Sequence, residues 1–359
     1  VANALLSYAE YIGKMVWPFE LTVFYPFPSA IPGWQVAGAF LLLAGISFWV
    51  IKGARQRPYA VVGWLWYMGT LVPVIGLVQV GSQAMADRYA YLPLIGLFMI
   101  AAWGISEFSA RLRIKKVWLT ASAGVLLSLL ITTTWRQVGY WENSVALFTR
   151  ALAVTTDNPV AHNNLGYTLS TQGKFEKAVN HYLEALRLYP DCTVAHYNLG
   201  NALGDLDKPA QAIYHYLEVL RLNPKHTGAL NNLGNVLAKQ GTLNDAVDHY
   251  SAALKIDPKN PKTYKNFGAV LIRLGRLGEA IPLFREALEI YPDYPDAHSD
   301  LGVALAIRGQ MAEAITHFRK ALRLEPGHVE AARALELAMA KRQVFSSKLK
   351  ENLNLNKDI

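Results

Sequence analysis

Residues 161–190, "AHNNLGYTLSTQGKFEKAVNHYLEALRLYP", contain the pattern that predicts the structure of the second half of this 359-residue chain. The stretch holds a Leu-Gly pair, an alanine, an aromatic residue and a closing proline, set among apolar residues at helical spacing. Small Gly and Ala side chains let two helices approach closely, and the aromatic ring fills the space between them. Because proline cannot continue a helix, it ends the second one. The stretch therefore predicts a pair of packed antiparallel helices.

The same order occurs five times, and each copy follows the last after 34 residues. The copies align at Leu165, Leu199, Leu233, Phe267 and Leu301, each followed by glycine; at Ala178, Ala212, Ala246, Ala280 and Ala314; at Tyr182, Tyr216, Tyr250, Phe284 and Phe318; and at Pro190, Pro224, Pro258, Pro292 and Pro326. A 34-residue period of helix pairs is the tetratricopeptide (TPR) pattern. We therefore predict a TPR α-solenoid over residues 141–328, made of a half repeat and five full repeats. A capping helix and a tail are expected over residues 329–359.

The turn between the two helices of a repeat is also recognisable. Four copies have glycine there, namely Gly173, Gly241, Gly275 and Gly309. The second copy has Asp207 instead, which tolerates the left-handed backbone conformation better than most residues. Pro209 follows two residues later, where it suits the first turn of the next helix.

The first 140 residues are of a different kind, because long apolar runs dominate them. Four runs approach the roughly 20 residues that a helix needs to cross a ~30 Å hydrocarbon core: residues 34–51, 59–80, 91–106 and 117–135. Residues 1–33 precede them and are predicted to form an amphipathic interfacial helix and an aromatic loop. The sequence thus predicts an all-α protein with about four spans in residues 34–140, followed by the solenoid.

Charge sets the expected orientation of these spans. Residues 1–140 carry ten Lys/Arg and four Asp/Glu, and most of the basic residues lie in two short loops, residues 52–57 and 111–116. Short basic loops stay on the cytoplasmic side, so the loop around residue 88 and all repeats should face the outer side. We interpret the net charge of +8 as topology information, and we expect no nucleic-acid partner.

One repeated position is not needed for packing. The residue before each Leu-Gly or Phe-Gly pair is polar throughout: Asn164, Asn198, Asn232, Asn266 and Asp300. This position of the first helix is expected to line the concave face of a TPR superhelix. A side-chain amide can donate to a backbone carbonyl and accept from a backbone N–H at once, so the row could hold an extended peptide. The alternative is a soluble lining without a ligand. The row resembles the asparagine ladder of the O-GlcNAc transferases.

Metal binding is not expected from the histidines. All nine lie in the repeats, and equivalent ones recur one repeat apart, about 10 Å, too far to share an ion. Cys192 is the only cysteine, so the chain can form no internal disulfide.

Three stretches together resemble one family. They are "WPFELTVFYPFP" (17–28), "GSQAMADRYAYLP" (81–93) and "WENSVALFTRAL" (141–152), the last leading into the repeats. They resemble the transmembrane-and-TPR protein O-mannosyltransferases and their bacterial relatives, which are integral-membrane GT-C glycosyltransferases. The resemblance implies a polyprenyl-phosphate-linked sugar as donor, a polypeptide hydroxyl as acceptor, and chemistry at the outer membrane face. The absence of Asn-x-Ser/Thr sequons favours a bacterial source and thus the bacterial inner membrane.

The same resemblance gives the charged residues of residues 81–93 a role. Transfer from a lipid phosphate needs a base for the acceptor hydroxyl and a cation for the leaving phosphate. Arg88 is expected at the outer membrane surface, where its guanidinium could pair with phosphate. Asp87 could orient it, and Tyr89 and Tyr91 could stack on the sugar; Glu20 is a weaker candidate. The alternative is an interfacial Asp–Arg pair with tyrosines that anchor a loop. The family's catalytic acid lies in a first outer loop that is expected upstream of residue 1, so the catalytic residue stays unknown.

Two other functions are compatible with the sequence. The chain could be a non-catalytic, membrane-anchored TPR scaffold for protein–protein interaction. It could also be a ligase or polymerase of lipid-linked glycans, but such an enzyme would be expected to use Arg and His late among its spans, and no histidine precedes His162.

Overall fold

The computed structural model describes residues 2–18, 21–23, 25–26, 31–72 and 91–341. Within these ranges every regular element is an α-helix, which confirms the predicted all-α class. The contacts divide the chain into two units, residues 1–192 and 193–359, and each is described by itself.

Three helices of the first unit are long and apolar enough to cross a membrane: α2 (Gly33–Lys52), α4 (Tyr91–Arg111) and α5 (Lys116–Gly139). They coincide with three of the four expected spans. The remaining one, residues 59–80, begins as α3 (Pro58–Leu71), but residues 73–80 lie outside the described part of the chain.

Glycines bring α3 and α4 into close contact. A Cβ atom on Gly63 would overlap the carbonyl oxygen of Gly96, and a Cβ atom on Gly96 would overlap that of Gly63. Apolar attraction between helices is weak in lipid, so close backbone approach at small residues is a common way for membrane helices to pack. Tyr67 and Leu71 are fully buried in the apolar cluster that α1 to α4 share.

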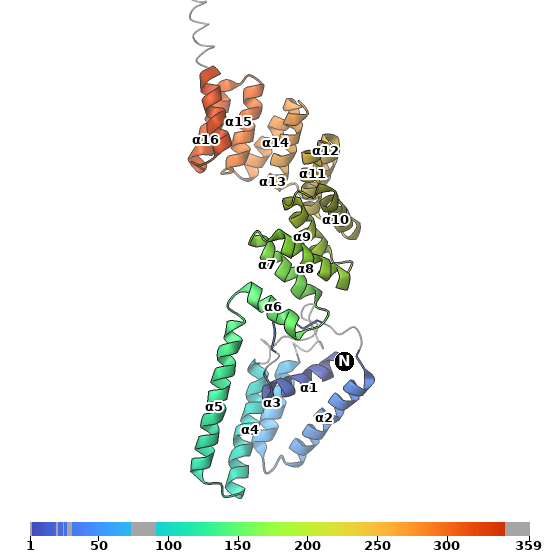
Figure 1. The fold of residues 1–359 in the computed structure, drawn as a ribbon, viewed down its shortest axis with the longest axis vertical. Coiled ribbons are helices and arrows are strands. Elements are labelled where there is room, and N and C mark those ends of the chain that lie inside the picture. The colour runs from blue at the N-terminus through green and yellow to red at the C-terminus, as the bar shows by residue number, and fades with distance from the viewer. Residues whose placement is uncertain (1, 19–20, 24, 27–30, 73–90, 342–359) are drawn as a thin grey trace, which may run out of the picture. The chain divides into compact units, whose positions relative to one another are not determined.

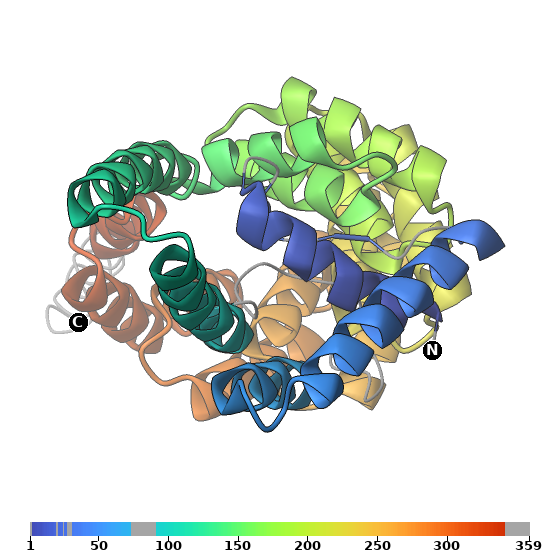
Figure 2. The ribbon, with the colours of Figure 1, turned by 90° about the horizontal axis from the view of Figure 1, so that it is seen from below.

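The N-terminal helix α1 (Ala2–Val16) is bound to α3 by two tyrosines. The Tyr67 hydroxyl donates to the carbonyl oxygen of Tyr8, and the Tyr8 hydroxyl donates to that of Met68. In both views α1 and α2 also lie next to each other (Figure 1 and Figure 2). The predicted N-terminal helix is therefore present, while its place at a membrane interface stays a prediction.

One carboxylate joins the two basic loops. Glu107, near the end of α4, accepts from Arg57 Nε (2.9 Å) and Nη2 (3.0 Å) and from the Tyr59 hydroxyl (2.9 Å). Arg111 Nη2 lies 2.8 Å from the same carboxylate. Arg57 belongs to the first basic loop and Arg111 to the second, so both loops lie at the same end of these helices.

The repeats are helix pairs, as predicted. The first unit holds α6 (Ser144–Val154), α7 (Pro159–Thr171) and α8 (Phe175–Leu188). The second unit holds four pairs: α9 (Thr193–Asp205) with α10 (Pro209–Leu222), α11 (Thr227–Gln240) with α12 (Leu243–Ile256), α13 (Pro261–Arg273) with α14 (Leu277–Ile290), and α15 (Pro295–Ile307) with α16 (Met311–Leu324) (Figure 1). Helix α6 contacts α7 as the expected half repeat. Residues 329–341 are helical, and their role as a cap stays a prediction.

The repeated glycine and aromatic residue meet within every pair. A Cβ atom on Gly200 would lie 2.8 Å from the Tyr216 ring, and one on Gly302 would lie 2.6 Å from the Phe318 ring. These separations are too short for any side chain, so glycine is required there. The turn residues also behave as expected, since Gly173, Gly241, Gly275, Gly309 and Asp207 all have positive φ.

Candidate functional site

The expected donor site lies mostly outside the described residues. Asp87, Arg88 and Tyr89 fall within residues 73–90, and Glu20 is also outside. Tyr91, the first residue of α4, is 75% exposed. The roles given to these residues stay predictions.

The predicted polar row lies on the first helices of the repeats. Asn164 is on α7, and Asn198, Asn232, Asn266 and Asp300 are on α9, α11, α13 and α15. In the second unit these four helices contact one another in sequence, α9 with α11, α11 with α13 and α13 with α15. The row is thus carried from repeat to repeat on one layer of helices.

The amides of this layer bind one another. The Asn232 amide Nδ2 donates to Asn201 Oδ1 (2.8 Å) and to the Tyr197 hydroxyl (3.1 Å), both on α9. Asn231 Nδ2 donates to Asn232 Oδ1 (3.0 Å), and Asn266 Nδ2 donates to Asn231 Oδ1 (3.1 Å). A continuous chain of hydrogen bonds therefore joins α9, α11 and α13.

This network changes the interpretation of individual row members. Both N–H donors of the Asn232 amide and one acceptor position of its oxygen are already used in hydrogen bonds within the protein. Asn232 therefore connects neighbouring repeats and has no N–H left for a peptide backbone. Among the described residues, the Asn266 side chain donates one hydrogen bond, to Asn231, and its Oδ1 accepts none. Asn266 therefore keeps the donor and acceptor pair that a peptide backbone requires.

Three members of this network, Asn201, Tyr197 and Asn231, were not predicted from the sequence. Asn201 also accepts from the Tyr216 hydroxyl (2.8 Å), and it therefore links the second helix of its repeat to the row. Tyr197 precedes the row position by one residue. The sequence does show polar residues next to the row. They directly precede it at positions 163, 197, 231 and 265, and they follow it by three residues at positions 201 and 235.

The last member of the row is electrostatically different. Lys265 Nζ lies 4.0 Å from Asp300 and 3.9 Å from Asp296. Burial raises the pKa of Asp300 to about 6, although the Lys265 ammonium acts in the opposite direction. An asparagine stands at this position in the other repeats, so Asp300 introduces a charge where the other repeats have none.

The expectation that the histidines stay apart is wrong within three of the repeats. The Nδ1 atoms of His162 and His181 are 3.1 Å apart, those of His196 and His215 3.0 Å, and those of His298 and His317 3.0 Å. Equivalent positions of successive repeats are about 10 Å apart, whereas each of these pairs joins the two helices of one repeat. No cluster of three or more His, Cys, Asp or Glu with metal-site geometry occurs among the described residues.

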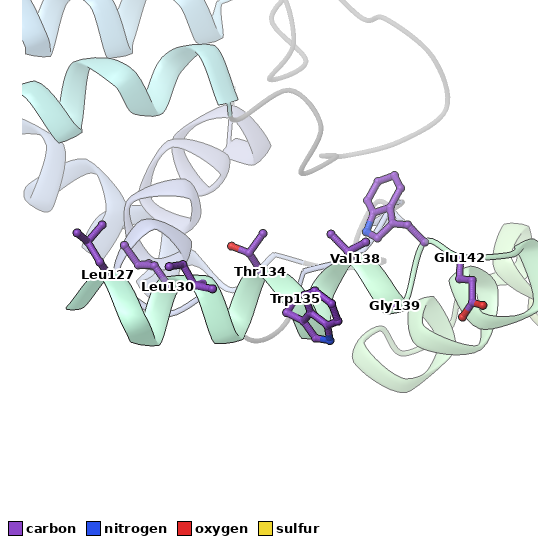
Figure 3. Close-up of a pocket in the computed structure, with 9 residues that line it drawn as sticks. Leu127, Leu130, Thr134, Trp135, Val138, Gly139 and Glu142 are labelled. Atoms are coloured by element: carbon purple, nitrogen blue, oxygen red, sulfur yellow. The ribbon is translucent and has the colours of Figure 1, made fainter. Parts of the chain in front are cut away.

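A hollow in the first unit is lined mainly by apolar residues. Its lining comes from α5 and the turn after it, including Leu127, Leu130, Thr134 and Val138 (Figure 3). None of the side chains of α5 is buried. This surface is what a lipid-facing helix presents to the acyl chains.

Comparisons with known proteins agree with the repeats. Tetratricopeptide-repeat models match residues 159–192, 193–226, 226–293 and 266–329. Among solved structures, the TPR protein YrrB is 25% identical (TM-score 0.43), covering 53% of this chain and 97% of that one. The APC/C hetero-tetramer Cut9–Hcn1 is 19% identical with a TM-score of 0.50, covering 58% of this chain and 41% of that one. The latter likeness shows the fold alone.

Curated relatives connect the chain with glycosylation. Protein O-mannosyl-transferase TMTC4 of Mus musculus is 27% identical over 41% of this chain and 20% of its own length. Protein O-mannosyl-transferase Tmtc2 of Drosophila melanogaster is 30% identical over 29% of this chain and 11% of its own. The matched part thus spans a fifth or less of these relatives. These findings support a membrane-associated TPR protein that is similar, weakly and in part, to the TMTC O-mannosyl-transferases.

Proposed function

We propose that this chain belongs to a membrane-embedded protein O-glycosyltransferase that uses a polyprenyl-phosphate-linked sugar. Its repeats form an outer-face arm that binds the polypeptide acceptor. The observation that carries the proposal is the layer of side-chain amides on α9, α11 and α13, in a chain that also has three membrane-length apolar helices. The partial similarity to O-mannosyl-transferases supplies the reaction class.

The orientation follows from charge. Arg57 and Arg111 meet at Glu107, so the two basic loops share one side, which the positive-inside tendency assigns to the cytoplasm. Helix α5 starts beside the second basic loop and ends at Gly139, shortly before the repeats. If α5 crosses the bilayer, the repeats emerge on the outer side. A lumenal or bacterial periplasmic face is where this proposal places the reaction.

The acceptor is held by its backbone. A polypeptide that receives sugar on a hydroxyl must present that side chain in an extended, accessible form. Asn266 offers an amide oxygen and an N–H for a passing peptide group, and such a contact reads no side chain. The arm should therefore bind unfolded or extended segments with little sequence preference.

The donor is held by charge. In this proposal Arg88 pairs with the departing lipid phosphate and lowers the energy of the negative charge that develops there. Asp87 orients Arg88, and Tyr89 and Tyr91 contact the sugar. Catalytic removal of the acceptor proton is assigned to no residue of this chain.

A transfer assay tests the proposal. Membranes that contain the protein as its natural gene encodes it receive a radiolabelled polyprenyl-phosphate sugar and an unfolded polypeptide. Arg88→Ala should abolish incorporation, and Arg88→Lys should restore part of it, because an ammonium cannot reproduce the planar fork of guanidinium. The matched control is Arg55→Ala, in a basic loop on the opposite side. Full transfer by Arg88→Ala would remove Arg88 from the donor site. Peptide binding without any transfer in the wild type would favour the scaffold function.

A further inference from the structure

Three repeats each bring two imidazole rings into contact across their helix pair. In each, one histidine comes from the first helix and the other follows 19 residues later on the second helix. The ring centroids lie 5.2–5.4 Å apart in the three pairs. The first-helix rings of His196 and His298 are buried, at 7% and 8% exposure, whereas His215 and His317 reach the surface. The same geometry therefore occurs three times, with one side open to solvent.

The distance between the two Nδ1 atoms of each pair is close to the distance between two nitrogen ligands of one metal ion. Two nitrogens bound to one tetrahedral Zn²⁺ at ~2.0–2.1 Å are ~3.3–3.4 Å apart. Cis nitrogens on a square-planar Cu²⁺, at a similar bond length, are about 2.9 Å apart. The observed 3.0–3.1 Å falls between these values. Little movement of the helices is thus needed, although each ring must turn so that its lone pair points at the ion.

The His298–His317 pair also has the outer hydrogen bond that a metal-binding histidine normally makes. His298 Nε2 lies 3.0 Å from the carbonyl oxygen of Pro292, so this nitrogen carries the proton and Nδ1 is left as an electron-pair donor. Metal-ligating histidines commonly donate their other ring N–H to a backbone carbonyl or carboxylate in this way. The proton that His317 then holds on Nδ1 would move to its own Nε2 when an ion binds, so no proton has to leave the pair.

The charges around the pairs are mixed, with carboxylates facing each of them. Glu184 faces His162, Glu218 faces His215, and Asp293 and Glu313 face the third pair; the cations Arg187, Lys320 and Arg285 act against a dication. Burial lowers the pKa of His215 to about 4 and also lowers that of His317. The rings of His215 and His317 are therefore neutral at pH 7, which is the form that binds metals.

We propose that the three histidine pairs are bidentate binding sites for a divalent ion of the zinc–copper–nickel class, with water completing the coordination. Imidazole is a preferred ligand of these ions. A bound ion would join the two helices of its repeat from the outside of the aromatic core. This proposal does not depend on sugar transfer.

The chain supplies a matched control. His249 occupies the same place on α12 as His215 on α10, but Leu230 stands where the partner histidine would be. The test uses the full chain in detergent, without a polyhistidine tag. Zn²⁺ binding is measured by titration calorimetry, and the number of nitrogen ligands on Cu²⁺ by electron paramagnetic resonance. Asparagine is the substitution, because its amide can occupy the position of Nδ1.

The wild type should bind three ions, each Cu²⁺ with two nitrogen ligands. His317→Asn and His215→Asn should each reduce the count from three to two, and His249→Asn should leave it at three. Zn²⁺ should raise the melting temperature of the wild type, because an ion that binds only the folded state stabilises it. An unchanged count in both pair variants, or Cu²⁺ with one nitrogen ligand in the wild type, would overturn the proposal. If one variant fails to fold, the ligand number in the wild type still decides.

Discussion

Replacing Asp300 by asparagine should stabilise the repeats at neutral pH. Burial raises the pKa of the Asp300 carboxyl group from its ordinary value of 3.8 to about 6. A group whose pKa is higher in the folded state favours folding while it is protonated, and that stability is lost as pH rises from about 4 through about 6. The full difference corresponds to about 3 kcal/mol above pH 7, at about 1.4 kcal/mol per pKa unit. Because 31% of the Asp300 side chain is exposed, solvent screens it, and we expect about 1–2 kcal/mol.

The assay is denaturant unfolding of the full chain in detergent, wild type against Asp300→Asn, from pH 4 to pH 8. The stability of the variant relative to the wild type should increase as pH rises, because the wild type loses stability, and the difference should reach a plateau above pH 7. At pH 4 the difference should shrink to about 0.5 kcal/mol or less, because both states of the wild type then hold much of the proton. A difference that does not change with pH, or a variant less stable than the wild type at pH 7, would refute the assignment of Asp300 as a buried charge.

Four further substitutions, two of them with a matched glycine control, test the packing and the amide layer. Gly200→Ala should destabilise the chain by about 1–3 kcal/mol in thermal melts, because the added methyl group would overlap the Tyr216 ring. Gly204→Ala on the same helix is the control and should be neutral or slightly stabilising, because its methyl group would meet no atom within 4 Å. Gly96→Val should separate α3 from α4 and lower the melting temperature in detergent. Gly104→Val is the control, because a side chain at position 104 would meet no atom within 4 Å. Equal effects of the two substitutions would contradict the contact between Gly63 and Gly96. Asn232→Ala should cost about 1–3 kcal/mol of stability because it removes three hydrogen bonds to buried or partly buried partners, while Asn266→Ala should weaken the binding of an unfolded polypeptide by about 0.5–1.5 kcal/mol and change stability less. If Asn266→Ala lowered the stability and Asn232→Ala lowered the affinity for the polypeptide, the roles given to these two asparagines would be wrong.

The repeats could be predicted from the sequence because each repeated residue makes the same packing contact in every helix pair. Gly166 faces Tyr182, and the same contact recurs down to Gly302 and Phe318. Asp207 has the positive φ that its place among turn glycines indicates. These requirements are met within one helix pair, so the same residue types recur every 34 residues in the sequence.

Contacts that depend on how helices cross could not be predicted in the same way. His298 and His317 meet because of the angle between α15 and α16, and a spacing of 19 residues is no helical period. Gly63 and Gly96 are in contact, whereas Gly69 and Gly104, in equally apolar surroundings, have open space. The bonds of Asn232 likewise depend on Asn201 and Tyr197 in the neighbouring repeat. Each of these pairs becomes visible only when the helices are placed in three dimensions.

The most direct test of the central claim, that the repeats hold the polypeptide which receives the sugar, is site-specific crosslinking during transfer. A photoreactive residue replaces Ala269, one turn from Asn266 on α13, and a control replaces Glu286 on the second helix α14. Membranes that contain the complete protein are illuminated while labelled sugar is transferred to an unfolded polypeptide. We predict that the position 269 probe crosslinks to the acceptor and that position 286 does not. Active transfer with no crosslink from position 269, or with equal crosslinks from both positions, would contradict the account.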